Sequence, residues 1–299
     1  SMSLPAPVYQ IQLDFPVRPA PRYGWGKPPH AQLSRLLDRH REAYRTRLEA
    51  FLDYREALAR IPKHPTAGQP NQPAWINGSL PGLDAAALYG FLASGKPSRY
   101  VEIGIGNSTR FARRAIEDQG LPTRITAIDP YPMPGVEAIC DQLIPEPLEA
   151  IDLALFDELA AGDLLFIDNS HRVFMNSDAT VVFLDILPRL KSGVIVECHD
   201  IALPFDYPPH WADKFYAEQY LLAAYLLAGG DRFEVLLPNA FVSLDPILSR
   251  ILDPLWLDPR LNAGTRPTIQ EQLARGAAPP PPASGLIETH GSSFWLRMS

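Results

Sequence analysis

The chain has 299 residues, a hydrophobic content of 46% and a formal net charge of −7 at pH 7. This hydrophobic content is enough for a sizeable core, in one large domain or in one domain with a substantial appendage. The acidic balance argues against a nucleic-acid surface, and the lack of a run of about 18 apolar residues argues against a membrane span.

The start of the chain and its cysteines bear on the cellular compartment. Ser1-Met2-Ser3-Leu4-Pro5 has neither a charged segment nor an apolar segment of the kind found in secretory signals. Cys140 and Cys198 make neither a disulfide framework nor a Cys-x-x-Cys metal motif. We therefore expect a cytoplasmic protein with reduced thiols.

Residues 1–95 are predicted to be an arm and a helical extension. Residues 1–30 are rich in proline, and residues 31–61 carry apolar side chains at helical spacing until Pro62. This helix is interpreted as a lid or a dimerisation element, so a homodimer is one expected assembly. A short helix at 83–94 leads into the first strand.

Residues 96–299 are predicted to be the main domain, because apolar strands alternate with helices there. Such alternation is typical of a parallel sheet with helices on both faces. Pro238-Asn239 separates two apolar runs and predicts a hairpin, residues 250–285 are a Pro-rich excursion, and residues 293–297 return as a last strand. The predicted strands are 99–103, 124–128, 163–168, 193–198, 233–237 and 240–244, with one short strand not placed between 129 and 162. The predicted helices are 108–118, 133–142, 176–190 and 214–228.

The most informative segment runs from Tyr100 to Thr109 and reads YVEIGIGNST. A buried strand breaks there into a tight turn at Gly104 and Gly106, where the backbone can approach a ligand closely. Ser108 or Thr109 can cap the helix that follows, so that helical N–H groups point toward a ligand above the turn.

The strand at 124–128 ends in Asp129, about 23 residues after Gly106. A carboxylate there can accept hydrogen bonds from two ribose hydroxyls. Dinucleotide enzymes and S-adenosylmethionine (SAM) enzymes share this kind of pocket, but the dinucleotide motif requires a third glycine where Thr109 stands. The segment therefore favours SAM over a dinucleotide, while Asp129 as a plain turn residue remains an alternative.

Polar side chains follow two further strands. Asp168 and His171 follow the strand at 163–168, and His199 and Asp200 end the strand at 193–198. Ligands bind at the carboxyl ends of parallel strands, and these residue types serve as metal ligands and general bases. The alternatives are a turn cap for Asp168, a solvent-facing loop position for His171 and an internal hydrogen-bonded pair for His199 and Asp200.

Three segments, 100–112, 164–171 and 193–201, together resemble class I SAM-dependent methyltransferases. The likeness is greatest to the small-molecule O-methyltransferases that include macrocin-type sugar methyltransferases and cephalosporin-hydroxylase-like proteins. The resemblance covers residues 95–245 and implies an α/β, doubly wound, mostly parallel seven-stranded sheet of the Rossmann-like methyltransferase type. It also implies SAM as the cofactor and a small-molecule substrate.

The resemblance also implies roles for individual residues. The SAM site would be lined by Glu102, near the methionine amine, and by Gly104, Gly106, Asn107 and Ser108, with Asp129 on the ribose. Asp168 would bind a divalent metal and His171 would be the general base, so that both are catalytic. His199 and Asp200 would complete the metal site. The expected cofactors include a divalent metal, Mg²⁺, Mn²⁺ or Fe²⁺. The subgroup usually has acidic or amide groups where His199 stands, and an imidazole in that place favours Mn²⁺, Fe²⁺ or Zn²⁺ over Mg²⁺.

The expected reaction is metal-assisted methyl transfer to a hydroxyl. The second interpretation is a methyltransferase-fold protein with hydroxylase-like or lyase-like chemistry, or one with only a ligand-binding role. A third, an NAD(P)-dependent oxidoreductase, is disfavoured by Thr109 and by the lack of a Tyr-x-x-x-Lys pair. The segment 204–211, with four aromatic or imidazole side chains, is predicted either to contact the substrate or to close the edge of the core.

Overall fold

The computed structural model describes residues 14–229, 232–261 and 286–299. Seven strands form one sheet in the order β3-β2-β1-β4-β5-β7-β6. Only β7 runs antiparallel to its neighbours β5 and β6, while the remaining pairs are parallel. The predicted fold class, a mostly parallel, Rossmann-like seven-stranded sheet, is confirmed. The strands are β1 (Arg99–Ile103), β2 (Arg124–Ile128), β3 (Gln142–Ile144), β4 (Leu164–Ile167), β5 (Ile195–Cys198), β6 (Phe233–Pro238) and β7 (Phe294–Met298).

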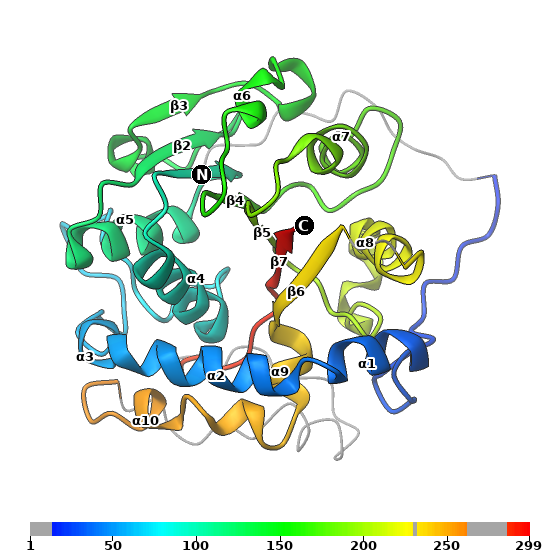
Figure 1. Cartoon of the computed structure of the whole chain (residues 1–299), viewed down its shortest axis with the longest axis horizontal. Helices are drawn as coiled ribbons and strands as arrows, with labels where there is room; N and C mark the ends of the chain where they lie inside the picture. Colours follow the sequence, from blue (N-terminus) through cyan, green and yellow to red (C-terminus); the bar gives the residue numbers. More distant parts are fainter. Residues whose placement is uncertain (1–13, 230–231, 262–285) are drawn as a thin grey trace.

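Helices cover both faces of this sheet (Figure 1). Figure 1 shows α4 (Gly82–Gly95) and α5 (Asn107–Gln119) on one side, and α7 (Asp178–Val181) and α8 (Glu218–Leu227) on the other. The helix α7 continues through a π-helical and a 3-10 turn to Arg189. Because β4 is buried at all four positions, both of its faces must be covered, which explains its continuous apolar sequence.

The N-terminal helices wrap around the β6 end of the sheet. They are α1 (Ala31–Asp38), α2 (Arg41–Phe51), a 3-10 turn (Leu52–Tyr54) and α3 (Arg55–Leu58), where the sequence predicted one long helix. In α2 the side chains of Tyr44, Leu48 and Phe51 recur on one face and are buried in the common core. The helical extension therefore shares its core with the sheet. The proposed boundary near residue 95 and the homodimer stay predictions.

Two predicted elements are wrong. Residues 240–244 are not a strand but lie in the helix α9 (Asn239–Leu244), because β7 takes the place beside β6 that the predicted hairpin would have filled. The backbone N–H of Asn239 donates to the carbonyl of Ser293, which fixes the start of this helix against the C-terminal segment.

Residues 133–142 were expected to be a helix, but only a 3-10 helix (Val136–Ile139) forms there. It is followed by β3, which is the short strand expected between residues 129 and 162. The remaining short helices are α6 (Ala154–Asp157), α10 (Asp253–Trp256) and the 3-10 helices Leu148–Ala150, Pro209–Lys214 and Leu248–Arg250. The first part of the predicted excursion, up to residue 261, contains α10, and residues 262–285 lie outside the described residues. Within the described ranges, no helix has the length and apolarity needed to cross a membrane.

Candidate functional site

The candidate site lies at the carboxyl ends of β1, β2, β4 and β5. The chain connects β1 outward to β2 and β3 on one side, and β4 outward to β5 on the other, so the order reverses between β1 and β4. Open α/β sheets bind ligands at such a reversal. This reversal lies between the loop from Gly104 to Gly106, which follows β1, and Asp168, which follows β4.

Gly104 has a backbone that only glycine can provide at low cost. Its φ is +86°, and a Cβ built on it would lie 2.1 Å from the carbonyl oxygen of Asp168. Its N–H donates to the carbonyl of Ile128 over 2.9 Å. The turn therefore brings the end of β1 against both β4 and β2, and the positive φ at Gly104 agrees with the tight glycine turn that the sequence predicted.

Glu102 lies beneath the glycine turn and is fully buried. Its Oε2 accepts a hydrogen bond of 2.6 Å from the hydroxyl of Thr109, which in turn accepts one of 3.0 Å from the N–H of Gly106. Its other oxygen has no hydrogen-bond partner among the described residues. Burial raises the pKa of Glu102 to about 8, although Ser108 and Thr109 act in the opposite direction. A cation placed above the turn would favour the charged carboxylate.

Asp129 links the glycine turn to the end of β2. Its Oδ2 accepts from the N–H of Ile105 at 3.0 Å, and its Oδ1 accepts from the N–H of Tyr131 at 2.7 Å. Each carboxylate oxygen has more than one acceptor site, so the residue can hold the loop and still bind hydroxyl donors. This position fits the predicted ribose contact, which stays a prediction.

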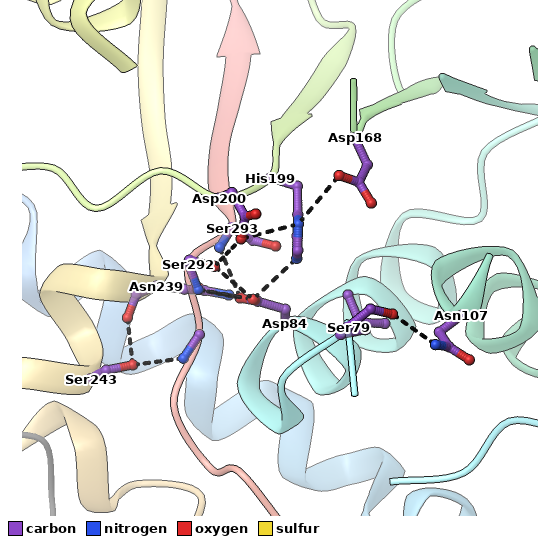
Figure 2. A network of polar contacts seen from close by, with 12 residues as sticks. Ser79, Asp84, Asn107, Asp168, His199, Asp200, Asn239, Ser243, Ser292 and Ser293 are labelled. Atoms are coloured by element: carbon purple, nitrogen blue, oxygen red, sulfur yellow. Dashed lines mark hydrogen bonds and ion pairs between the residues drawn. The ribbon is translucent and has the colours of Figure 1, made fainter. Parts of the chain in front are cut away.

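Asn107 and Ser108 open α5 and are both buried. The amide nitrogen of Asn107 donates to the hydroxyl of Ser79 over 2.7 Å (Figure 2). Its amide oxygen accepts from Arg110 over 2.7 Å. These bonds connect the segment before α4 to the first turn of α5. The side chain of Asn107 thus shapes the wall of the site through Ser79.

The four polar residues predicted at two strand ends do come together. The Nε2 of His171 lies 3.2 Å from Oδ1 of Asp168 and 3.6 Å from Oδ2 of Asp200. The Nδ1 of His199 lies 3.7 Å from Oδ1 of Asp168 and 3.5 Å from Oδ1 of Asp200. Both histidines are buried, whereas Asp168 is partly exposed and faces the glycine turn.

The charges of this group are strongly coupled. Burial lowers the pKa of His171, but the carboxylates of Asp168 and Glu218 outweigh it and raise the pKa to about 10. The same balance raises the pKa of His199 well above its usual range, with Asp200 and Asp168 as the main charges. Burial would raise the pKa of Asp168, yet the two imidazoles hold it well below its usual range.

His199 also belongs to a polar network that reaches α4 (Figure 2). Its Nε2 lies 3.5 Å from Oδ2 of Asp84, a fully buried carboxylate on that helix. Asp84 accepts hydrogen bonds from the N–H groups of Ser292 and Ser293 and from the amide of Asn239. The hydroxyl of Ser292 lies 3.2 Å from Oδ1 of Asp200, which closes the network.

The described residues do not support the predicted metal site. No group of three or more His, Cys, Asp or Glu side chains in them is arranged to hold a metal ion. The imidazole nitrogens of His171 and His199 are instead directed at carboxylates, as ion pairs of 3.2 to 3.7 Å. The metal roles of Asp168, His199 and Asp200 stay predictions.

Sequence reasoning missed Asp84 and Glu218. Asp84 is the only acidic residue in the otherwise apolar helix at 82–95, a signal that the chain did offer. Glu218, which opens α8, was interpreted as packing, but it is fully buried and contacts the ring of His171. By contrast Glu197, not expected to be a ligand, is buried in β5 with both oxygens unpaired among the described residues. Burial raises its pKa well above the usual range.

Three comparisons place these observations among known proteins. Residues 101–201, a third of the chain, match the family model of a methyltransferase domain. No curated protein sequence matches the chain. The family model is broader than the macrocin-type subgroup, so that narrower resemblance stays a prediction.

Several solved methyltransferase structures are similar in chain arrangement. The methyltransferase PaMTH1 of Podospora anserina, bound to S-adenosylhomocysteine (SAH), is 20% identical over 66% of this chain and 83% of that chain, with a TM-score of 0.36. An O-methyltransferase from Bacillus cereus in complex with SAH is 15% identical over 64% and 82%, with a TM-score of 0.34. TomG of Streptomyces achromogenes, an O-methyltransferase involved in tomaymycin synthesis that was solved with SAM, is 18% identical over 65% and 81%, with a TM-score of 0.33.

At these identities and TM-scores, the three structures carry no conclusion about the activity of this chain. The match to the methyltransferase domain, in contrast, runs from β1 to just beyond β5. It therefore includes Glu102, Asp129 and the four polar residues at the ends of β4 and β5.

Proposed function

We propose that this protein is a SAM-dependent methyltransferase that acts on a hydroxyl group of a small molecule. The observation that carries the proposal is the contact between the glycine turn and Asp168, where a Cβ on Gly104 would strike the Asp168 carbonyl. The glycine turn therefore lies directly beside Asp168, which is paired with His171. A methyl donor over the turn and a proton acceptor would then share one edge of the sheet.

The residues present fit SAM. Glu102 has one buried oxygen beneath the turn with no hydrogen-bond partner in the described part of the chain, and a cationic amine near the turn would stabilise the charged carboxylate. Gly106 leaves its Cβ direction open, with only the terminal methyl of Met133 at 3.8 Å. Asp129 stands at the end of the neighbouring strand with a partly exposed carboxylate. We assign the amine to Glu102, the backbone approach to Gly104 and Gly106, and the ribose to Asp129.

When bound, SAM supplies a methyl group on a sulfonium, a leaving group that departs as the neutral thioether of SAH. The acceptor oxygen forms the new bond to carbon while the electron pair of the carbon–sulfur bond goes to sulfur, and the hydroxyl proton goes to Nε2 of His171. Because His171 is held with a pKa of about 10, it must lose a proton before it can act as a base. A sulfonium cation nearby would lower that pKa by charge repulsion.

The acceptor would approach from the segment between β5 and α8. The ring of Tyr216 lies against His171 with centroids 4.5 Å apart, and the ring of Trp211 lies against Tyr216 at 5.6 Å. Tyr207 contacts Tyr216 as well, at 5.8 Å. We propose that Tyr216, together with Tyr207 and Trp211 of the segment 204–211, contacts a ring or scaffold of the acceptor beside the base. Substrate contact is one of the two roles predicted for that segment, the other being closure of the core edge.

Methyl transfer from SAM carrying a labelled methyl group, offered to a panel of phenols, catechols and sugar alcohols, tests the proposal. Label in an ether product, reduced at least 100-fold in His171→Asn, is the expected result. SAM binding without transfer to any hydroxyl would favour the second interpretation, a methyltransferase-fold protein with other chemistry. Transfer to nitrogen or carbon would contradict the O-methyltransferase assignment.

The methyl transfer described for His171 does not involve a metal, so metal assistance is tested separately. The protein is stripped with a chelator and titrated with Mn²⁺ and Mg²⁺ by calorimetry. A site lost in Asp168→Ala and in Asp200→Ala would support the metal role predicted from the resemblance. The absence of a binding heat for either ion would contradict it.

A further inference from the structure

We infer that Glu218 is a positioning residue for His171, and that the start of α8 holds this histidine in one orientation. The inference rests on the proposed function, because it concerns the same base. Glu218 lies outside the strand ends, and its role would be to hold His171 in the orientation that a general base needs. Four features of His171 support this role: its backbone conformation, the contacts of its ring nitrogens, the packing on its ring face and its burial.

His171 has an unusual backbone that the surroundings must enforce. Its φ is +59°, in the left-handed region that residues with a Cβ rarely adopt. A conformation of this kind persists only where neighbouring groups over-determine it. Non-glycine residues held in this way cluster at functional sites.

Hydrogen bonds hold both ends of this strained residue. Its N–H donates to the side-chain oxygen of Asn169 over 2.7 Å. Its carbonyl accepts from the N–H of Ala217 at 2.8 Å and from the N–H of Glu218 at 3.3 Å. The start of α8 therefore fixes the main chain of His171.

The same helix turn fixes the ring. The Nδ1 of His171 is hydrogen bonded to Oε1 of Glu218, and both side chains are almost completely buried. A charged carboxylate only accepts hydrogen bonds, so we assign the proton of this contact to Nδ1. The Nε2 is then the nitrogen that faces Asp168 and Asp200, on the side of the glycine turn.

This is the arrangement in which a base is oriented by a third group. A buried carboxylate behind the ring sets both the direction of the imidazole and the nitrogen that is offered to the acceptor. Tyr216 packs on the ring face, so rotation of the ring would cost that contact as well. Glu218 is buried and contacts Nδ1 of His171, on the opposite ring nitrogen from the one that faces Asp168, which is why we assign it a positioning role.

The experiment compares Glu218→Gln and Glu218→Ala with Tyr220→Phe, a control on the same helix whose half-exposed side chain donates its hydroxyl hydrogen bond to Asp206 and not to His171. Protein labelled with ¹⁵N-histidine is examined by NMR for a slowly exchanging, downfield Nδ1 proton, assigned through His171→Asn. The kcat and the KM for SAM are measured on the same samples. Thermal unfolding shows that each variant is folded.

The wild type and Tyr220→Phe should show the Nδ1 proton. Glu218→Gln should keep it at a smaller downfield shift, because an amide oxygen still accepts, and Glu218→Ala should lose it. We expect kcat to fall about 10-fold in the Gln variant and 100-fold or more in the Ala variant, with the KM for SAM changed less than about 2-fold. An unchanged Nδ1 proton and unchanged kcat in folded Glu218→Ala would overturn the inference.

The failure of the proposed function would look different. If the wild type transfers no methyl group while the Nδ1 proton is present and depends on Glu218, the positioning stands and the reaction is wrong. If methyl transfer is confirmed but the proton is absent from the wild type, the positioning is wrong and the reaction stands.

Discussion

The carboxylate of Asp84, on α4, lies 3.5 Å from the Nε2 of His199 at the end of β5 (Figure 2). It also accepts hydrogen bonds from the N–H groups of Ser292 and Ser293, just before β7 begins. One buried charge thus joins a helix, a site residue and the C-terminal strand. Gly291 belongs to this arrangement, because a Cβ there would lie 2.2 Å from the Asp84 carboxylate.

Substitution of Asp84 by Ala should destabilise the protein by about 3–5 kcal/mol. The change removes the carboxylate that accepts from two backbone N–H groups and that faces Nε2 of His199, and uncompensated buried partners are costly. The free energy of unfolding from urea titrations measures the effect. Asp38→Ala is the control, because that carboxylate is exposed and makes only a surface ion pair with Arg41. Equal losses in the two variants would contradict the role of the network.

Gly104→Ala and Gly106→Ala should differ sharply. Gly104 combines a φ of +86° with a carbonyl 2.1 Å from the added Cβ, so its substitution must shift Asp168 or the turn. Gly106 has φ 177°, which is extended backbone, and its added Cβ meets only the Met133 methyl at 3.8 Å. We expect a loss of about 2 kcal/mol or more for Gly104→Ala and less than 0.5 kcal/mol for Gly106→Ala by urea unfolding.

The two variants also locate the cofactor. If SAM crosses the turn, the methyl of Gly106→Ala should weaken SAM binding at least 10-fold without a matching loss of stability. Calorimetric titration of the folded variant measures this. Wild-type affinity in Gly106→Ala would place the cofactor elsewhere.

Glu102 should make the stability of the unliganded protein depend on pH. Its folded pKa of about 8 is above the ordinary value of 4.5, so the folded state holds this proton over a range in which the unfolded chain has lost it. Stability contributed by this residue is therefore complete below about pH 4.5 and is lost as pH rises toward 8. Glu102→Gln, which resembles the protonated acid, should remove the dependence and be more stable at pH 8 by a few kcal/mol.

Urea unfolding of the wild type and Glu102→Gln at pH 5 and pH 8 measures this difference. The gap between the two proteins should open only at the higher pH. Glu234→Gln is the matched control, because Glu234 is partly exposed and paired with Arg297 at the surface. A gap of the same size at both pH values would show that Glu102 is charged throughout.

Much of the fold could be predicted because burial on both faces leaves a simple pattern. The strands β1, β2, β4 and β5 are short apolar runs, and their ends are marked by polar residues or glycine. Since parallel strands end at one edge, Asp129, Asp168 and His199 could be placed together without knowledge of any contact.

The errors came from elements whose sequence is ambiguous. The run at 240–244 is apolar but short, and periodicity cannot tell a buried strand from a buried helix at that length. Residues 240–244 do not form a strand beside β6, because β7, from the C-terminal end of the chain, pairs with β6 there. The strand β3 has only three residues and carries no periodic signal of its own.

The carboxylates behind the two histidines could not be deduced for a different reason. Asp84 lies on a helix far before its partner His199 in the sequence, and Glu218 lies 47 residues after its partner His171. Their partners are set by how α4 and α8 pack on opposite faces of the sheet (Figure 1). A buried acid in an apolar helix indicates that a partner exists, but only the packing identifies it.

Calorimetric titration with SAM of the wild type and Asp129→Ala is the most direct test of the central claim, that the glycine turn binds SAM. The account predicts binding in the micromolar range for the wild type and a loss of at least 10-fold in Asp129→Ala. The loss is expected because that carboxylate holds the N–H of Ile105 and is the group proposed to bind the ribose. No binding of SAM or SAH to the folded wild type would contradict the claim.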